Sequence, residues 1–191
     1  MVVSPIKLYI LAHLKRAGID YAKSISRVLK SPISIIVEEL NKMEKAELIE
    51  RTYGSAIKRT EARFKLSYEV RKHHTYYKLT KEGENLLKHL KNNLEKYFED
   101  VTGDCKAFKM FNFILKAENE HPCYIARSHS MNIERVKEIL SKLVELELIE
   151  ECKPRILKRK HRKAKPKKET RTQHKYYRVT RLGKMLFRYI S

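Results

Sequence analysis

The chain has 191 residues, with 43 Lys and Arg against 23 Asp and Glu, and its formal net charge is +20. This charge predicts an anionic partner, with nucleic acid first and a membrane surface second. No apolar run approaches the roughly 18 residues that span a bilayer, and residues 1–14 lack the pattern of a secretory signal, so no membrane partner is expected. Three widely spaced cysteines favour a reducing cytoplasm over a disulfide scaffold.

The first half of the chain predicts three helices, a strand, a long basic connection, a second strand and a fourth helix. Apolar periodicity and short aromatic or aliphatic runs place these elements at residues 6–17, 21–29, 32 onward, 48–52, 72–79 and 81 onward. Ser31 is expected to be the N-cap of the third helix, with Pro32 in its first helical position. The expected fold class is mainly α with small β-hairpins, that is α+β.

The second half repeats the first at a constant offset of 100 residues. Residues 74–83 read His-Thr-Tyr-Tyr-Lys-Leu-Thr-Lys-Glu-Gly, and residues 174–183 read His-Lys-Tyr-Tyr-Arg-Val-Thr-Arg-Leu-Gly. The sequence Glu-Leu-Ile-Glu that begins at Glu47 recurs unchanged from Glu147, and no gap is needed anywhere. We infer an internal duplication with two domains, residues 1–99 and 100–191.

The end of the repeated pattern predicts a strand that runs into a helix. Thr80 and Thr180 are suited to be N-caps, because a Thr hydroxyl accepts a hydrogen bond from a backbone N–H of the first helical turn. Gly83 and Gly183 fall in that first turn, where a missing side chain lets another element approach closely. We therefore expect this pattern to be a structural anchor.

This order of elements is that of a winged helix-turn-helix domain, and three stretches carry a family resemblance. Residues 76–83 resemble the Tyr-x-Leu-Thr-x-x-Gly end of the wing in bacterial and archaeal winged-helix regulators. Residues 40–49 resemble the helix and Gly-Leu-Ile that enter their wing, with Glu47 where many members have Gly. Residues 11–18, with 55–63, resemble an uncharacterised archaeal winged-helix family. The resemblance implies two tandem winged helix-turn-helix domains, but no target, because fold does not fix function.

The fourth helix of the first half is predicted to run past the domain edge. Leu87, Leu90, Leu94, Tyr97 and Phe98 keep a helical spacing, and the stretch around Gly103 ends it. This extension could be a strut that packs on its own chain, which we favour, or the seam of a homodimer.

The two connections carry most of the excess charge. Residues 51–75 hold seven Lys or Arg and two Glu, and residues 151–175 hold twelve and two, so their net charges are +5 and +10. Such runs favour binding to phosphates with release of counterions over a solvated, solubilising tip. The residues predicted to bind nucleic acid are Lys58, Arg59, Arg63, Lys65, Arg71, Lys72, Arg155, Lys158, Arg159, Lys160, Arg162, Lys163, Lys165, Lys167, Lys168 and Arg171.

The third helix of each half is where a helix-turn-helix protein would read bases. The candidates for base reading are Ser34, Asn41, Lys42, Asn132 and Arg135. Several Glu residues lie beside them, and Ile35 and Val37 add apolar surface. We therefore expect binding to be led by the phosphate backbone or by DNA shape more than by these helices.

Three functions remain open from the sequence. The first is a non-catalytic DNA-binding protein, either a transcriptional regulator or a chromatin-associated factor. The second is an RNA- or ribosome-associated factor that binds rRNA through its second basic connection. The third is a module that docks a protein partner through the apolar positions of the third helix and the long fourth helix.

No catalytic site can be singled out. The five glycines are isolated, which excludes a Gly-rich phosphate loop, and no Cys-x-x-Cys pair is present. His121, Cys123 and His129 are more simply explained as ordinary side chains than as metal ligands. We expect no enzyme activity, no metal and no cofactor.

Overall fold

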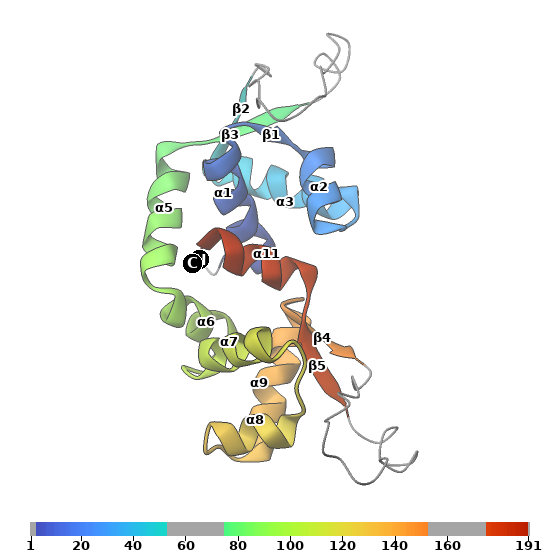
Figure 1. Ribbon diagram of the computed structural model, residues 1–191. Coiled ribbons are helices and arrows are strands. Elements are labelled where there is room, and N and C mark those ends of the chain that lie inside the picture. The colour runs from blue at the N-terminus through green and yellow to red at the C-terminus, as the bar shows by residue number, and fades with distance from the viewer. Residues whose placement is uncertain (1–2, 53–74, 153–174, 191) are drawn as a thin grey trace. The chain divides into compact units, whose positions relative to one another are not determined.

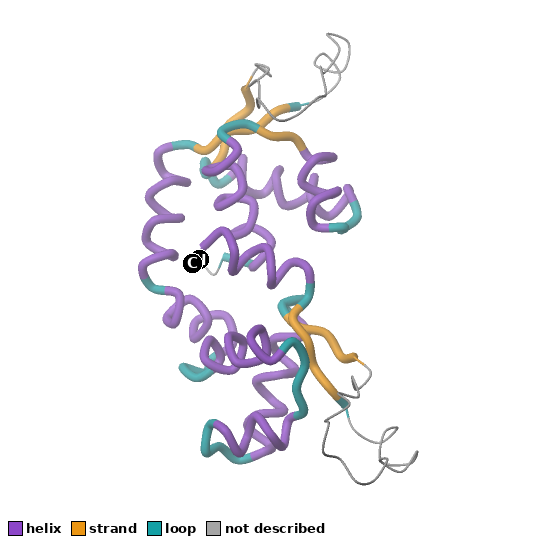
Figure 2. Tube along the Cα trace, viewed as in Figure 1, coloured by secondary structure: helices purple, strands orange, loops and turns teal. Residues whose placement is uncertain are grey.

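The computed structural model describes residues 3–52, 75–152 and 175–190, which are mainly helical with small antiparallel sheets (Figures 1 and 2). The chain divides into two compact units. The N-unit consists of Ile6–Asn92 and Met185–Ser191, and the C-unit of Met1–Pro5 and Asn93–Lys184. Each unit therefore takes in a short segment from the opposite end of the chain.

The N-unit places its first three helices beside a small sheet and adds α5 after the hairpin. Its elements are α1 (Pro5–Ala17), β1 (Asp20–Tyr21), α2 (Ala22–Leu29), α3 (Ile33–Lys45), β2 (Ile49–Thr52), β3 (Tyr76–Leu79) and α5 (Lys81–Asn92). The strand order is β1-β3-β2, and all neighbours are antiparallel. The short strand β1 was not predicted, because two residues are too few to show an alternating pattern. The core is formed by the apolar faces of the three helices, with Leu11, Ile25, Ile36 and Leu40 fully buried.

The C-unit repeats this arrangement after one additional helix. Its elements are α6 (Leu94–Thr102), α7 (Ala107–Ala117), α8 (Pro122–Ser128), α9 (Ile133–Glu145), β4 (Ile149–Cys152), β5 (Tyr176–Val179) and the start of α11 (Arg181–Ile190). The bounds of α9, β4 and β5 equal those of α3, β2 and β3 plus 100. A single bridge between Glu120 and Tyr177 stands in place of β1.

The repeated Thr-x-x-Gly pattern fixes the hairpin to the end of the third helix. The Thr80 hydroxyl donates to the carbonyl of Glu47 at 2.7 Å and accepts from the N–H of Gly83 at 3.0 Å. A Cβ on Gly83 would lie 2.1 Å from the carbonyl oxygen of Leu48. The expected helix cap and the expected close approach are both confirmed.

The C-unit makes the same contacts. Thr180 donates to Glu147 at 2.6 Å and accepts from the N–H of Gly183 at 3.0 Å. A Cβ on Gly183 would lie 2.5 Å from the carbonyl oxygen of Leu148. The pattern is therefore a structural anchor in both copies.

Two predictions about helix boundaries were wrong. The continuous fourth helix is two helices, because Asn93 leaves helical geometry at φ −130° and ψ 49° between α5 and α6. Tyr97 and Phe98 are buried, and Phe98 packs on Phe111 with ring centroids 5.2 Å apart. These two side chains thus serve the core of the C-unit, and a homodimer through the fourth helix stays a prediction.

The start of the third helix also differs from the prediction. Pro32 is itself the N-cap residue of α3, and the helix begins at Ile33. Ser31 therefore stands outside the helix. In the second copy, Asn132 occupies the N-cap and its side-chain oxygen accepts from the N–H of Glu134 at 2.8 Å.

Within the described residues, each helix falls short of the length and apolarity that a membrane span requires.

Candidate nucleic-acid interface

Each basic connection starts and ends at paired residues of a two-stranded stem. Thr52 is paired with Tyr76, and Cys152 with Tyr176. The stem strand β2 packs against α3, and β4 packs against α9. Each connection therefore leaves a hairpin whose first strand contacts the third helix of the same unit.

The residues predicted to bind phosphate belong to the connections themselves. They lie outside the described residues, and they are Lys58, Arg59, Arg63, Lys65, Arg71, Lys72, Arg155, Lys158, Arg159, Lys160, Arg162, Lys163, Lys165, Lys167, Lys168 and Arg171.

The basic side chains of the stems are paired with carboxylates. On the hairpin of the N-unit, Lys78 lies 2.8 Å from Glu50. On the hairpin of the C-unit, Arg178 lies 2.7 Å from Glu150, which is the same cross-strand pair displaced by 100 residues. The described stems thus add little net positive charge.

The exposed face of α3 holds the three base-reading candidates of the N-unit. Ser34 and Asn41 are exposed. Lys42 is also exposed, but its ammonium lies 2.7 Å from Glu38 and 3.0 Å from Glu39. Hydrogen bonds with these two carboxylates, first Glu38, raise the pKa of Lys42. The charge of Lys42 is therefore compensated within the helix.

The same helix presents exposed apolar side chains. Ile33 is 48% exposed, Val37 40% and Ile35 38%. Ile33, Val37 and Asn41 follow one another at intervals of four residues, so they form one row along α3. Ile35 lies about 200° around the helix from Ile33 and belongs to a different side.

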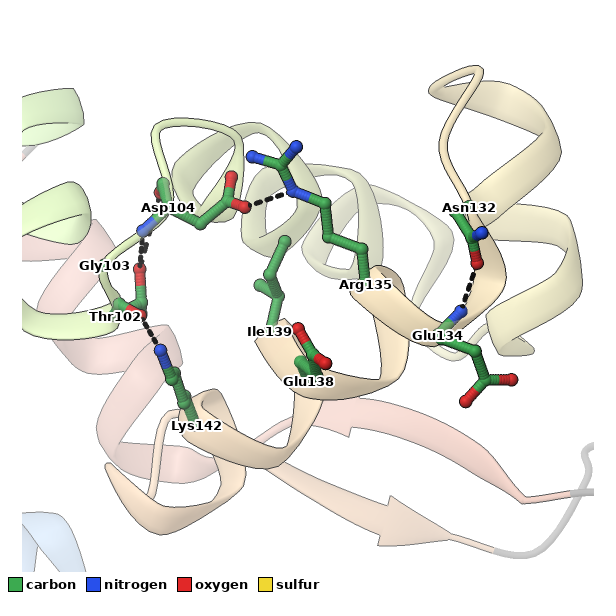
Figure 3. Close-up of a pocket in the computed structure, with 9 residues that line it drawn as sticks. All are labelled: Thr102, Gly103, Asp104, Asn132, Glu134, Arg135, Glu138, Ile139 and Lys142. Carbon is green, nitrogen blue, oxygen red and sulfur yellow. Dashed lines mark hydrogen bonds and ion pairs between the residues drawn. The ribbon is translucent and has the colours of Figure 1, made fainter.

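The corresponding helix of the C-unit is held by the turn between α6 and α7 (Figure 3). Arg135 Nε donates to Asp104 Oδ2 at 2.7 Å, and Lys142 Nζ donates to the carbonyl oxygen of Thr102 at 2.6 Å. Ile139 lies between these two contacts and is only 2% exposed. Of the two base-reading candidates here, Arg135 is already bonded, and Asn132 caps the helix.

Between the turn and α9 lies a groove of about 460 Å³, lined mainly by polar side chains. Burial acts to raise the pKa of Asp104, but hydrogen bonds from the N–H of Lys106 and from Arg135 outweigh it, and the pKa is lowered. Asp104 is therefore a stable anionic partner for Arg135. Nothing in the sequence pattern revealed this contact, because residues 31 apart show no common periodicity.

The described residues offer no cluster for a metal ion, since no three His, Cys, Asp or Glu side chains in them come together. His121 instead acts in the cap of α8, where its Nδ1 accepts from the N–H of Cys123 at 3.2 Å. His129 lies edge-on to Phe113, with ring centroids 5.2 Å apart.

Taken together, the elements define a mainly helical protein with two copies of one helical unit, each bearing a β-hairpin. A protein family described as an uncharacterized protein conserved in archaea (DUF2250) matches twice, over residues 1–90 and 98–190. The chain belongs to this archaeal family, and the two matches support the inferred duplication. No curated protein and no solved structure matches the chain.

Proposed function

We propose that each unit is a winged helix-turn-helix domain and that the protein is a non-catalytic nucleic-acid-binding protein that prefers duplex DNA. In this proposal α2 and α3, with their counterparts α8 and α9, are the helix-turn-helix pairs. The hairpins are the wings. The order of elements and their antiparallel pairing support the assignment.

The observation that carries the proposal is the placement of charge. The connections between the hairpin strands hold the largest concentrations of Lys and Arg in the chain, and each leaves a stem that packs on the third helix. Lysines and arginines in such a position can neutralise phosphates on either side of a groove. The exposed face of α3 would then lie towards the base edges.

The experiment replaces residues 155–171 of the full-length protein with a short Gly-Ser linker. This removes ten Lys or Arg and Glu169, a net charge of +9. Because each phosphate contact releases counterions, binding to a 30-base-pair duplex should weaken on the order of 10²-fold or more, with a shallower dependence on salt. Fluorescence anisotropy at several salt concentrations measures both quantities.

The matched control replaces residues 55–71 in the same way, which removes five Lys or Arg with Glu61 and Glu69, a net charge of +3. It should have the smaller effect on affinity and on the salt slope. Unchanged affinity and slope after the first replacement would refute binding through the connections. Tighter binding to an RNA hairpin than to duplex DNA of equal length would favour the RNA- or ribosome-associated alternative.

A further inference from the structure

The outer face of α3 combines methyl-bearing and amide side chains in one exposed row. Ile33 and Val37 are 48% and 40% exposed, and Asn41 continues the row one turn further along the helix. Ser34 is exposed on the same side, about 20° from Asn41 around the helix. The row thus sets two aliphatic side chains beside two neutral polar ones.

In the major groove, this set of side chains matches one kind of base pair. The 5-methyl group of thymine makes apolar contacts, and the amide of Asn bonds in a bidentate manner with N6 and N7 of adenine. Residues near the N-terminus of a recognition helix are the ones that contact base edges. Ile33 is the first residue of α3, and Val37 lies one turn later.

The row from Ile33 to Asn41 holds no Arg and no Lys, the side chains that read guanine. Guanine is read by Arg or Lys through O6 and N7. Lys42 lies about 100° around the helix from Asn41, on the side of Ile35, and its ammonium is held by Glu38 and Glu39 at 2.7 and 3.0 Å.

The C-unit lacks the row. Val37 is replaced by Lys137, which lies 2.9 Å from Glu134, and Asn41 is replaced by Ser141. Arg135 and Lys142 are bonded to the α6–α7 turn. The two copies are thus unequal in what they offer to a base edge.

We propose that α3 is the specificity-determining element and reads A·T base pairs, with Ile33 and Val37 against thymine methyl groups and Asn41 on adenine. This inference rests on the proposed function and deepens it, because it names the base pairs that the protein prefers. The C-unit contributes affinity for the backbone and little sequence preference.

The test uses the full-length protein and a set of A·T-rich duplexes in which thymine is replaced by deoxyuridine. Deoxyuridine lacks only the 5-methyl group, so phosphate contacts are unchanged. Each contacted methyl that is lost should weaken binding about threefold to fivefold, the equivalent of one buried CH₂. Replacing adenine with 7-deazaadenine removes N7 and should cost about tenfold at the position that Asn41 contacts.

Variants assign the effects to side chains. Val37→Ala should lose the response to deoxyuridine at the thymine that Val37 contacts and keep the response at the thymine that Ile33 contacts. Asn41→Ala should lose the response to 7-deazaadenine. Ile35→Ala is the matched control, because Ile35 is similarly exposed but lies on another side of α3. This variant should distinguish thymine duplexes from deoxyuridine duplexes, and adenine from 7-deazaadenine, as the wild type does. All three side chains are exposed, and circular dichroism will verify that each variant folds.

The outcomes separate the two proposals. Binding of every duplex with the same affinity, whatever the base composition, would overturn the reading of A·T pairs and leave the proposed function standing. A preference for G·C-rich duplexes would also overturn it. Failure to bind any duplex at low salt would reject the proposed function, and the inference with it.

Discussion

Glu47 has a φ of 57° at the turn from α3 into β2, and Glu147 repeats this value at the turn from α9 into β4. A residue with a Cβ pays roughly 1–2 kcal/mol for left-handed geometry, which glycine adopts freely. Gly83 is needed for another reason, because the carbonyl of Leu48 occupies the place where its side chain would be. The chain thus carries glycine where space is short and glutamate where the backbone is strained.

Two substitutions at this turn should change stability in opposite directions. Glu47→Gly should raise the free energy of unfolding of the N-unit by up to about 1 kcal/mol. Glycine relieves the strain of the left-handed backbone, but it also gives the unfolded chain more conformational freedom, which offsets part of the gain. Gly83→Ala should lower the free energy of unfolding by about 1–3 kcal/mol through overpacking. Urea unfolding followed by circular dichroism measures both. Glu47→Ala is the control: it keeps a Cβ, so a gain equal to that of glycine would contradict the role of strain.

At the scale of elements, α3 and α9 have the same bounds at an offset of 100 but different surroundings. The face of α3 that holds Ile33, Val37 and Asn41 is exposed, whereas α9 is bonded to the α6–α7 turn through Asp104 and Thr102. The turn exists because α6 ends at Thr102 with Gly103 in left-handed geometry, φ 75°. The surfaces of α3 and α9 therefore differ, although their sequences are similar, because α6 and the turn after it pack against α9.

The Asp104–Arg135 contact predicts a dependence on pH. The pKa of Asp104 in the folded protein is below that of the unfolded chain, about 3.9. Its contribution to stability is therefore present above about pH 4 and is lost as the pH falls through the lower, folded value. Asp104→Asn should lower the melting temperature of the C-unit by roughly 2–5 °C at pH 7, and the difference from wild type should shrink below pH 4.

Thermal unfolding between pH 7 and pH 2.5 provides this comparison. Asp100→Asn is the matched control, since Asp100 is half exposed and pairs with Lys96 on the surface of α6. It should have little effect at either pH. A constant difference between wild type and Asp104→Asn over the whole range would exclude Asp104 as the titrating group.

At the scale of the whole molecule, each compact unit includes residues from the far end of the chain. The N-unit takes in Met185–Ser191. Tyr189 packs edge-on against Tyr9 with ring centroids 5.6 Å apart. The guanidinium of Arg16 lies 5.1 Å from the centre of the Tyr189 ring. The last residues of the second copy are thus part of the first unit.

A substitution at Tyr189 should consequently weaken a helix that lies near the other end of the sequence. Tyr189→Ala should lower the free energy of unfolding of the N-unit by about 1–3 kcal/mol, through the loss of the aromatic and cation–π contacts. Hydrogen exchange should be faster at the amides of α1. Arg188→Ala changes an exposed neighbour and should leave exchange in α1 unchanged. Equal protection of α1 in both variants would contradict this role of Tyr189.

The sequence alone determined the elements and their duplication. The helical spacing of Ile36, Leu40 and Met43 located α3 to within a few residues, because burying an apolar face imposes a local period. The cap at Thr80 was interpreted correctly for the same reason, since its bond to the N–H of Gly83 is local. The close approach at Gly83 was indicated by the missing side chain, although the approaching carbonyl belongs to Leu48, far back in the chain. The two-residue strand β1 and the break at Asn93 were missed, because too few residues were involved to form a pattern.

Only the tertiary structure decided which candidate side chains of the two copies already have bonding partners. Arg135 and Asn41 were equal candidates in the sequence, and both side chains are exposed, but the Nε of Arg135 is already bonded to Asp104. The assignment of Tyr189 to the N-unit was also decided by packing. These features depend on contacts between residues far apart in the chain, and a single sequence contains no period or spacing that reports such contacts.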